Sequence, residues 1–138
     1  MIVIYIDGKP IPLKRHRSRK WGDKVISYDS QIEQKKQVIA KVLENICKLD
    51  PMPSEYPIFS GPIKAKMFFQ YKMPKTGKKK IADRGYIKMT RPDLSNLIKF
   101  YEDCIHEIVY ADDAQIVEIE AKKYYHDKDG VVLMFENA

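Results

Sequence analysis

The chain has 138 residues, 44% of them hydrophobic and 32% charged, and carries a net charge of +6. This composition indicates one folded domain, residues 1–138, that can bury a core without disulfide bonds, and it excludes a disordered chain. No apolar run approaches the roughly 20 residues of a membrane span, so we expect no membrane partner. Two isolated thiols, Cys47 and Cys104, favour the reducing cytoplasm.

The first half of the chain predicts two strands and one helix. Ile2–Asp7 is apolar and β-branched enough for a strand, and it is too short, without a positive leader, for a signal peptide. Residues 9–24 are rich in proline and basic side chains, so we expect a long loop or arm there. Residues 25–28 are a candidate short strand, as the return leg of a hairpin. A helix then runs from about residue 30 to residue 49, where the sequence DPMP ends it.

The second half predicts a strand, a second helix and two further strands. Residues 63–73 alternate as a half-buried strand does, and residues 74–92 form a long polar loop. A helix with an apolar stripe begins near Asp93. Strands are expected at 114–125 and 131–135, and the sequence HDKDG between them predicts a hairpin. The order β-(β)-α-β-α-β-β indicates an α+β fold, with two main helices against one mixed sheet.

Positive charge is concentrated in the arm and in the long loop. Residues 9–24 and 72–91 hold 15 of the 25 lysines and arginines but only two of the 19 acids, so these segments carry a net charge of +13 and the remainder carries −7. A positive surface around an acidic centre suits a partner that presents phosphates. The distribution therefore favours nucleic acid, with acids that place a metal ion against a phosphate.

Acids lie at both ends of the second helix. Asp93 stands where the helix begins, and an aspartate there is commonly an N-cap. The pair Asp112 and Asp113 follows the helix, where an exposed turn is the ordinary explanation. The alternative is that these carboxylates share a divalent cation, for which Mg²⁺ suits oxygen ligands and phosphate substrates. A helix of about 15 residues is roughly 22 Å long, so they meet only if the helix breaks early and the chain folds back, or if two subunits share a site.

The segment RPDLSNLIKFYEDCIHEIVYADDAQIVEI, residues 91–119, resembles the RusA family of Holliday junction resolvases, and GKPIPLKRHR near the N-terminus resembles the early proline-and-basic segment of that family. The resemblance implies a homodimeric, Mg²⁺-dependent endonuclease that binds four-way DNA junctions and cuts two strands symmetrically. It implies that Asp93 and Asp113 are catalytic acids that bind the metal. It further implies that Asp112 is an adjacent acid of the metal site and that Lys99 is the catalytic lysine, although a solvated lysine is the ordinary alternative.

Ser95 departs from the family pattern, which usually has an acid at this position that binds the metal. A hydroxyl is a weaker ligand than a carboxylate, so the affinity for Mg²⁺ should fall. Three outcomes remain open. Asn96 or Asp112 substitutes in a slightly shifted site, the enzyme needs more metal or prefers Mn²⁺, or the chain binds junctions with little cleavage. The rival hypothesis is a non-catalytic nucleic-acid-binding protein whose acids are caps and turns.

The basic segments predict contacts with DNA phosphates and little readout of bases. The arm also holds Arg19 and Lys20, Arg91 is expected nearer the cleaved phosphate, and the ordinary alternative for the lysine run is a solvated loop. The predicted DNA-binding residues are Lys14, Arg15, Arg17, Lys78, Lys79, Lys80 and Arg91.

Overall fold

A computed structural model describes residues 1–14 and 17–138. The elements in chain order are β1 (Ile2–Asp7), β2 (Arg17–Trp21), β3 (Lys24–Tyr28), α1 (Ile32–Cys47), β4 (Ile63–Lys72), α2 (Lys78–Asp83), α3 (Leu94–Ile105), the 3₁₀ turn η1 (Asp113–Gln115), β5 (Ile116–His126) and β6 (Gly130–Asn137). This order confirms the predicted α+β fold with two main helices. Within the described residues, no helix has the length and apolar composition needed to cross a bilayer.

The main sheet has four strands in the order β1-β6-β4-β5. β6 pairs antiparallel with both β1 and β4, whereas β4 and β5 are parallel, so the sheet is mixed as expected. The predicted hairpin between the last two strands is wrong, because β4 lies between them. Residues 127–129 instead pass the end of β4, where the Asp129 carboxylate accepts a hydrogen bond of 2.8 Å from the Lys72 N–H. The sequence HDKDG indicates only a local turn. The order of the strands depends on burial, and β4, whose alternate side chains are buried along its whole length, takes a central place in the sheet.

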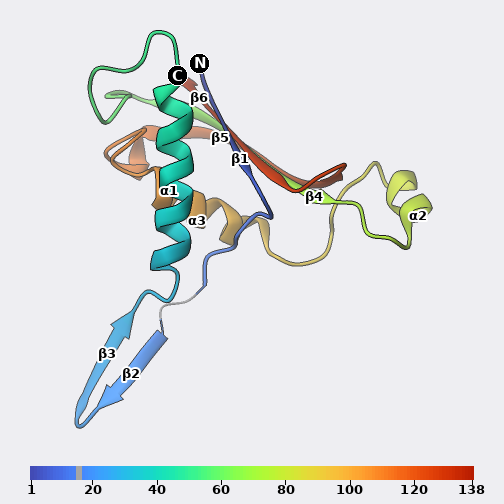
Figure 1. Cartoon of the computed structure of the whole chain (residues 1–138), viewed down its shortest axis with the longest axis horizontal. Coiled ribbons are helices and arrows are strands. Elements are labelled where there is room, and N and C mark those ends of the chain that lie inside the picture. The colour runs from blue at the N-terminus through green and yellow to red at the C-terminus, as the bar shows by residue number, and fades with distance from the viewer. Residues whose placement is uncertain (15–16) are drawn as a thin grey trace.

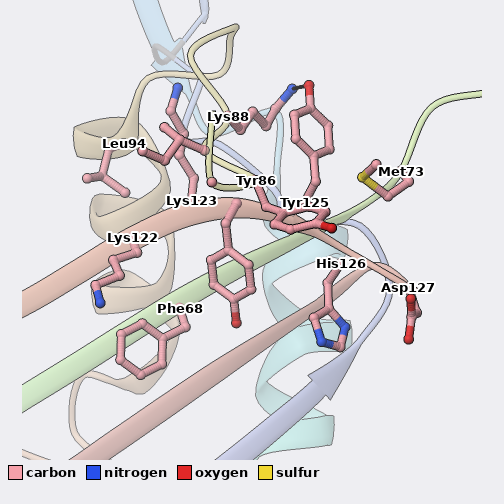
Figure 2. Close-up of a pocket in the computed structure, with 13 residues that line it drawn as sticks. Phe68, Met73, Tyr86, Lys88, Leu94, Lys122, Lys123, Tyr125, His126 and Asp127 are labelled. Carbon is pink, nitrogen blue, oxygen red and sulfur yellow. Dashed lines mark hydrogen bonds between the residues drawn. The ribbon is translucent and has the colours of Figure 1, made fainter. Parts of the chain in front are cut away.

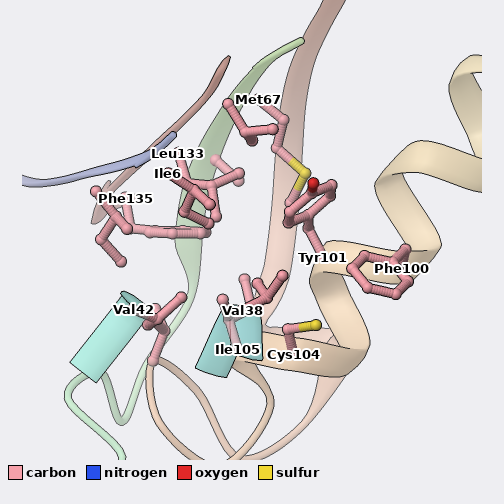
Figure 3. Packing of buried hydrophobic residues seen from close by; sticks show 14 of the residues in the cluster. Ile6, Val38, Val42, Met67, Phe100, Tyr101, Cys104, Ile105, Leu133 and Phe135 are labelled. Carbon is pink, nitrogen blue, oxygen red and sulfur yellow. The ribbon is translucent and has the colours of Figure 1, made fainter. Parts of the chain in front are cut away.

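Both main helices lie against one face of this sheet (Figure 1). α1 buries Val38, Val42 and Ile46 at intervals of four residues, as an amphipathic helix does. α3 buries Leu97, Phe100, Tyr101, Cys104 and Ile105. Figure 3 shows Tyr101 of α3 beside Met67 of β4, with Val38 and Ile105 close to each other on the helix side. The core therefore fixes the rotation of α3 and turns its polar side away from the sheet.

Residues 17–21, predicted as part of a loop or arm, form β2, which corrects that prediction. β2 pairs with β3 in a separate two-stranded sheet that projects from the body of the molecule (Figure 1). Its turn contains Gly22 with φ of +59°, a conformation that glycine adopts readily. The strand was missed because its side chains lack the apolar alternation that marks a half-buried strand.

The loop predicted at 74–92 contains a short helix, α2, which corrects the second irregular segment. None of the described α2 side chains is buried. Without an apolar face, the segment has no helical periodicity to read, so charge alone suggested a loop. Figure 1 shows α2 projecting from the molecule in a different direction from the β2–β3 hairpin.

Candidate functional site

Asp93 occupies the N-cap position of α3 with an extended backbone, φ −67° and ψ 137°. Its carbonyl oxygen accepts the N–H of Asn96 at 3.1 Å and of Leu97 at 3.2 Å. Among the described residues, however, its side chain makes no capping hydrogen bond. The expected N-cap position is therefore confirmed, but the expected side-chain hydrogen bond is absent within the part of the chain that the structure describes, and the exposed carboxylate remains available to a ligand.

A lysine of the sheet holds the chain that leads into α3. Lys123 Nζ, on β5, donates hydrogen bonds of 2.7 Å to the carbonyl oxygens of both Thr90 and Pro92. Lys88 Nζ donates to Thr90 Oγ1 at 2.7 Å. Hydrogen bonding with Thr90, with the charges of Lys88 and Lys123, lowers the pKa of Tyr125, although burial opposes this. The position of Asp93 thus depends on a strand about 30 residues away along the chain.

At its other end α3 stops at Ile105, after 12 residues. The chain then reverses at Glu107, whose φ is +68°, and the Glu107 N–H donates a hydrogen bond of 2.7 Å to the Tyr110 carbonyl. His106 Nε2 lies 2.7 Å from the Ala111 carbonyl oxygen. The early break that convergence of the acids requires is therefore present.

The turn after this reversal is closed by reciprocal capping. Asp112 Oδ1 accepts the Ala114 N–H at 2.9 Å, while Gln115 Oε1 accepts the Asp112 N–H at 3.0 Å. The same glutamine donates through Nε2 to the Phe59 carbonyl at 3.0 Å, which ties the turn to the chain before β4. The predicted acid Asp112 therefore has a structural role as a cap, and its role in a metal site stays a prediction.

Asp113 lies near a carboxylate that the sequence did not suggest. Burial, followed by the negative charges of Asp113 and Asp103, raises the pKa of Glu102, and the positive charge of Lys99 opposes this shift. Burial, with the charges of Asp113 and Glu102, also raises the pKa of Tyr110. The charges of Asp113 and Lys99 thus both act on Glu102. The signal for Glu102 was its spacing of three residues from Lys99, which places both on one side of a helix.

The carboxylates suit a hard cation, although the described residues contain no group of three or more Asp, Glu, His or Cys arranged to hold a metal ion. Mg²⁺ often takes one or two protein carboxylates and completes its shell with water and substrate phosphates. The oxygen donors of Asp93, Asp113 and Glu102 fit that chemistry. Glu102 follows Asp93 by nine residues, about 13 Å along the helix, so the sharing of one ion by Asp93 and Asp113 stays a prediction.

Hydrogen bonds attach the beginning of the basic arm to α3. The Leu13 N–H donates to the Asn96 carbonyl at 2.9 Å, and the Ile11 N–H donates to Tyr101 Oη at 3.1 Å. The exposed Lys14 follows at once, and its N–H donates to Oε1 of the buried Gln31 at 2.7 Å. The arm is therefore anchored one turn from Asp93 before it leaves the core.

The other predicted DNA-binding residues are distributed over both projecting elements. Arg15 lies outside the described residues, and Arg17 is described only through its backbone, in β2. The exposed Lys78, Lys79 and Lys80 open α2. Arg91 is exposed two residues before Asp93. The phosphate contacts of all these residues stay predictions.

Comparison with known proteins bears on nearly the whole chain. Residues 7–136 match the family described as endodeoxyribonuclease RusA. A curated relative, "Uncharacterized protein YqaN" of Bacillus subtilis (strain 168), is 30% identical over 83 residues, which are 56% of this chain and 58% of that protein. The chain thus spans less than two thirds of that relative's length.

Proposed function

The chain belongs to the RusA endodeoxyribonuclease family, and from this premise we propose that it is a Mg²⁺-dependent endonuclease that resolves Holliday junctions by paired, symmetrical cuts. The observation that carries the proposal is the state of Asp93, an acid at the start of the family's helix whose side chain does not cap that helix. Such a substrate would place the protein with cellular DNA in the cytoplasm.

In this proposal the acids of α3 and its following turn hold the metal, and the lysine neutralises charge on the phosphate. Asp93 and Asp113 supply carboxylate oxygens, with Glu102 beside Asp113. Mg²⁺, when bound, supplies a Lewis acid that activates water and stabilises charge on the leaving oxygen; Mn²⁺ supplies the same chemistry. Lys99 presents its ammonium group to the developing negative charge, which is most effective where water is excluded.

The projecting basic elements would hold the arms of the junction. The β2–β3 hairpin, which follows Lys14 in the chain, and α2, which holds Lys78–Lys80, project from the molecule in different directions (Figure 1). Lysines on such elements bind phosphates without reading bases, so affinity should fall steeply with salt. This arrangement supports recognition of DNA shape rather than sequence.

Two cuts require two active sites, so we include a homodimer in the proposal. β5 is an edge strand. Among the described residues, 86–88 pair with its outer side near Lys123 and Tyr125, through Lys88 N–H to Lys123 O at 3.4 Å and Tyr125 N–H to Tyr86 O at 2.8 Å. Val117 and Ile119 on the same strand are 61% and 41% exposed. An apolar edge of this kind invites a second copy related by a two-fold axis. Sedimentation of Ile119→Lys, expected to be monomeric, tests this.

A four-way junction assay tests the main proposal. Asp113→Asn should abolish Mg²⁺-dependent cutting of a synthetic junction while keeping or strengthening binding, because a negative charge facing DNA is lost. Asp50→Asn, on the exposed loop after α1, is the matched control and should cut normally. Equal loss of cutting and binding by Asp113→Asn would indicate a folding role and contradict the proposal.

The second candidate, a junction-binding protein with little cleavage, is favoured by Ser95. If the metal site is short of one carboxylate, Ser95→Asp should lower the Mg²⁺ concentration at which cutting is half maximal. The natural chain should then need more Mg²⁺, or cut better with Mn²⁺. An unchanged metal titration would place position 95 outside the site. If Ser95→Asp cuts junctions and the natural chain does not, the natural chain is better explained as a junction-binding protein.

A further inference from the structure

A groove of about 1050 Å³ lies beside the start of α3. Figure 2 shows that its lining comes from β4, from β5, from the segment that holds Tyr86 and Lys88, and from Leu94 at the start of α3. Both aromatic rings and lysines line it, and the residues that matter here are Phe68, Tyr86, Lys88, Lys122, Tyr124 and His126. It is distinct from the acids at the end of α3, none of which lines it.

One wall is chain held against the edge of β5. The Tyr125 N–H donates to the Tyr86 carbonyl at 2.8 Å, and Ile87 and Tyr124 form an antiparallel bridge. Tyr86 has φ of +63°, a left-handed conformation that is unfavourable for a side chain of this size. These contacts hold the Tyr86 ring at the groove while leaving 48% of the residue exposed.

The groove combines flat rings with positive charge. Lys122 pairs with Glu120 at 3.5 Å, whereas Lys88 and Lys123 make no ion pair with the described residues. Lys122 Nζ lies 5.8 Å from the centre of the Phe68 ring, and the rings of Tyr124 and His126 meet edge to face at 6.3 Å. Three lysines line the groove against one acid, Asp127. Rings on which bases stack, set among lysines that bind phosphates, are the common features of sites for single-stranded nucleic acid.

The groove extends to the start of α3. Leu94, the residue after Asp93, lines it, and so does Lys123, which holds the carbonyl oxygens of Thr90 and Pro92. A strand whose phosphate lies at Asp93 would therefore enter the groove within a few nucleotides.

We propose that this groove binds unpaired nucleotides of the DNA strand next to the cleaved phosphate, with bases stacked on Tyr86 and Phe68 and phosphates on Lys88 and Lys122. The placement next to the cleaved phosphate rests on the proposed function. The class of ligand, single-stranded DNA with its bases, rests on the groove alone.

The test compares a labelled twelve-nucleotide oligothymidine with an abasic oligomer of the same length and charge, using fluorescence anisotropy. The natural chain should bind the oligothymidine at least about fivefold more tightly, since stacking on an aromatic ring strengthens binding by this much or more per base. Tyr86→Ala should lose most of this preference and Tyr86→Phe should keep it. Tyr56→Ala is the matched control, because Tyr56 is also 48% exposed but lies outside the groove.

Phe68→Leu, which keeps an apolar side chain but removes the ring, is a second variant in case Tyr86→Ala is unfolded by circular dichroism. Equal affinity for the two oligomers, or equal effects of Tyr86→Ala and Tyr56→Ala, overturns the proposal. So does a loss of self-association in Tyr86→Ala without any change in base preference, which would assign the groove to a second copy. If the protein cuts junctions but shows no base preference, the proposed nuclease function stands and the proposal for the groove fails. If it shows base preference but does not cut, the proposal for the groove stands and the nuclease function fails.

Discussion

Asp93 and Asp112 occupy equivalent backbone positions and are used differently. Each stands with an extended backbone at the residue before a helical segment. Asp112 Oδ1 accepts the Ala114 N–H at 2.9 Å and closes its turn, whereas the side chain of Asp93 makes no capping hydrogen bond with the described residues. The local sequence predicted a side-chain cap at Asp93, whereas in the structure the aspartate whose side chain acts as a cap is Asp112.

The difference lies in what holds each turn. The turn at Asp112 is closed locally by its own side chain and that of Gln115. The chain before Asp93 is held from outside, by Lys123 on β5. Because a distant lysine holds this segment, the exposed Asp93 carboxylate takes no part in closing the turn and remains available for a ligand. An aspartate that does not cap its helix is thus a better candidate for chemistry than one that does.

The largest expected effect is on cleavage by Asp93→Asn. Asparagine suits an N-cap position as well as aspartate, so the change isolates the charge. Junction cutting should fall at least about a hundredfold, as when a group that stabilises transition-state charge is removed. The free energy of unfolding in urea should stay within about 0.5 kcal/mol, as for exposed sites without structural partners. A large loss of stability would show that Asp93 is structural after all.

Lys123→Met should have the next largest effect. It removes both hydrogen bonds to the chain before Asp93, and loss of such supporting contacts typically lowers activity about tenfold or more. Single-turnover cutting should fall by more than junction affinity. Lys66→Met is the control, because Lys66 is half exposed and its ion pair with Glu120, at 3.8 Å, is a weak surface one. Parallel decreases in rate and affinity would mean that Lys123 acts mainly by binding phosphate.

Asp112→Ala should cost about 1 kcal/mol of stability, the usual value for a lost cap, measured by urea unfolding. Asp112→Asn should keep most of that stability, since an amide oxygen can also accept the Ala114 N–H. If Asp112 acts only as a cap, the asparagine variant should also cut junctions at a near-normal rate. A loss of cutting as severe as that of Asp93→Asn would instead make Asp112 a metal ligand and remove the contrast between the two acids.

The smallest effect concerns Glu102, whose pKa is raised mainly by burial. A raised pKa means that ionised Glu102 disfavours the folded state at neutral pH, and that this cost disappears when the pH falls below the ordinary carboxyl value. Glu102→Gln should therefore melt at a higher temperature than the natural chain at pH 7, and the difference should shrink toward pH 4. A difference independent of pH would attribute the effect to packing.

Periodic and buried elements were predictable, and elements without buried faces were not. The strand β4 and the helices α1 and α3 have apolar faces that mark them in the sequence. The strand β2 and the helix α2 lack such patterns and were expected as loops. Glu102 was missed because its partner, Asp113, approaches it only after the chain reverses at Glu107.

The sequence by itself determined the α+β class, the segregation of positive charge and the family segment at 91–119, because these follow from composition, periodicity and the order of residues. The tertiary structure decided that β4 separates the last two strands, that Lys123 rather than Asp93 secures the start of α3, and that a groove with rings and lysines adjoins it. Each of these depends on contacts between residues far apart in the chain, whose free energies are settled only when the core and the sheet form together.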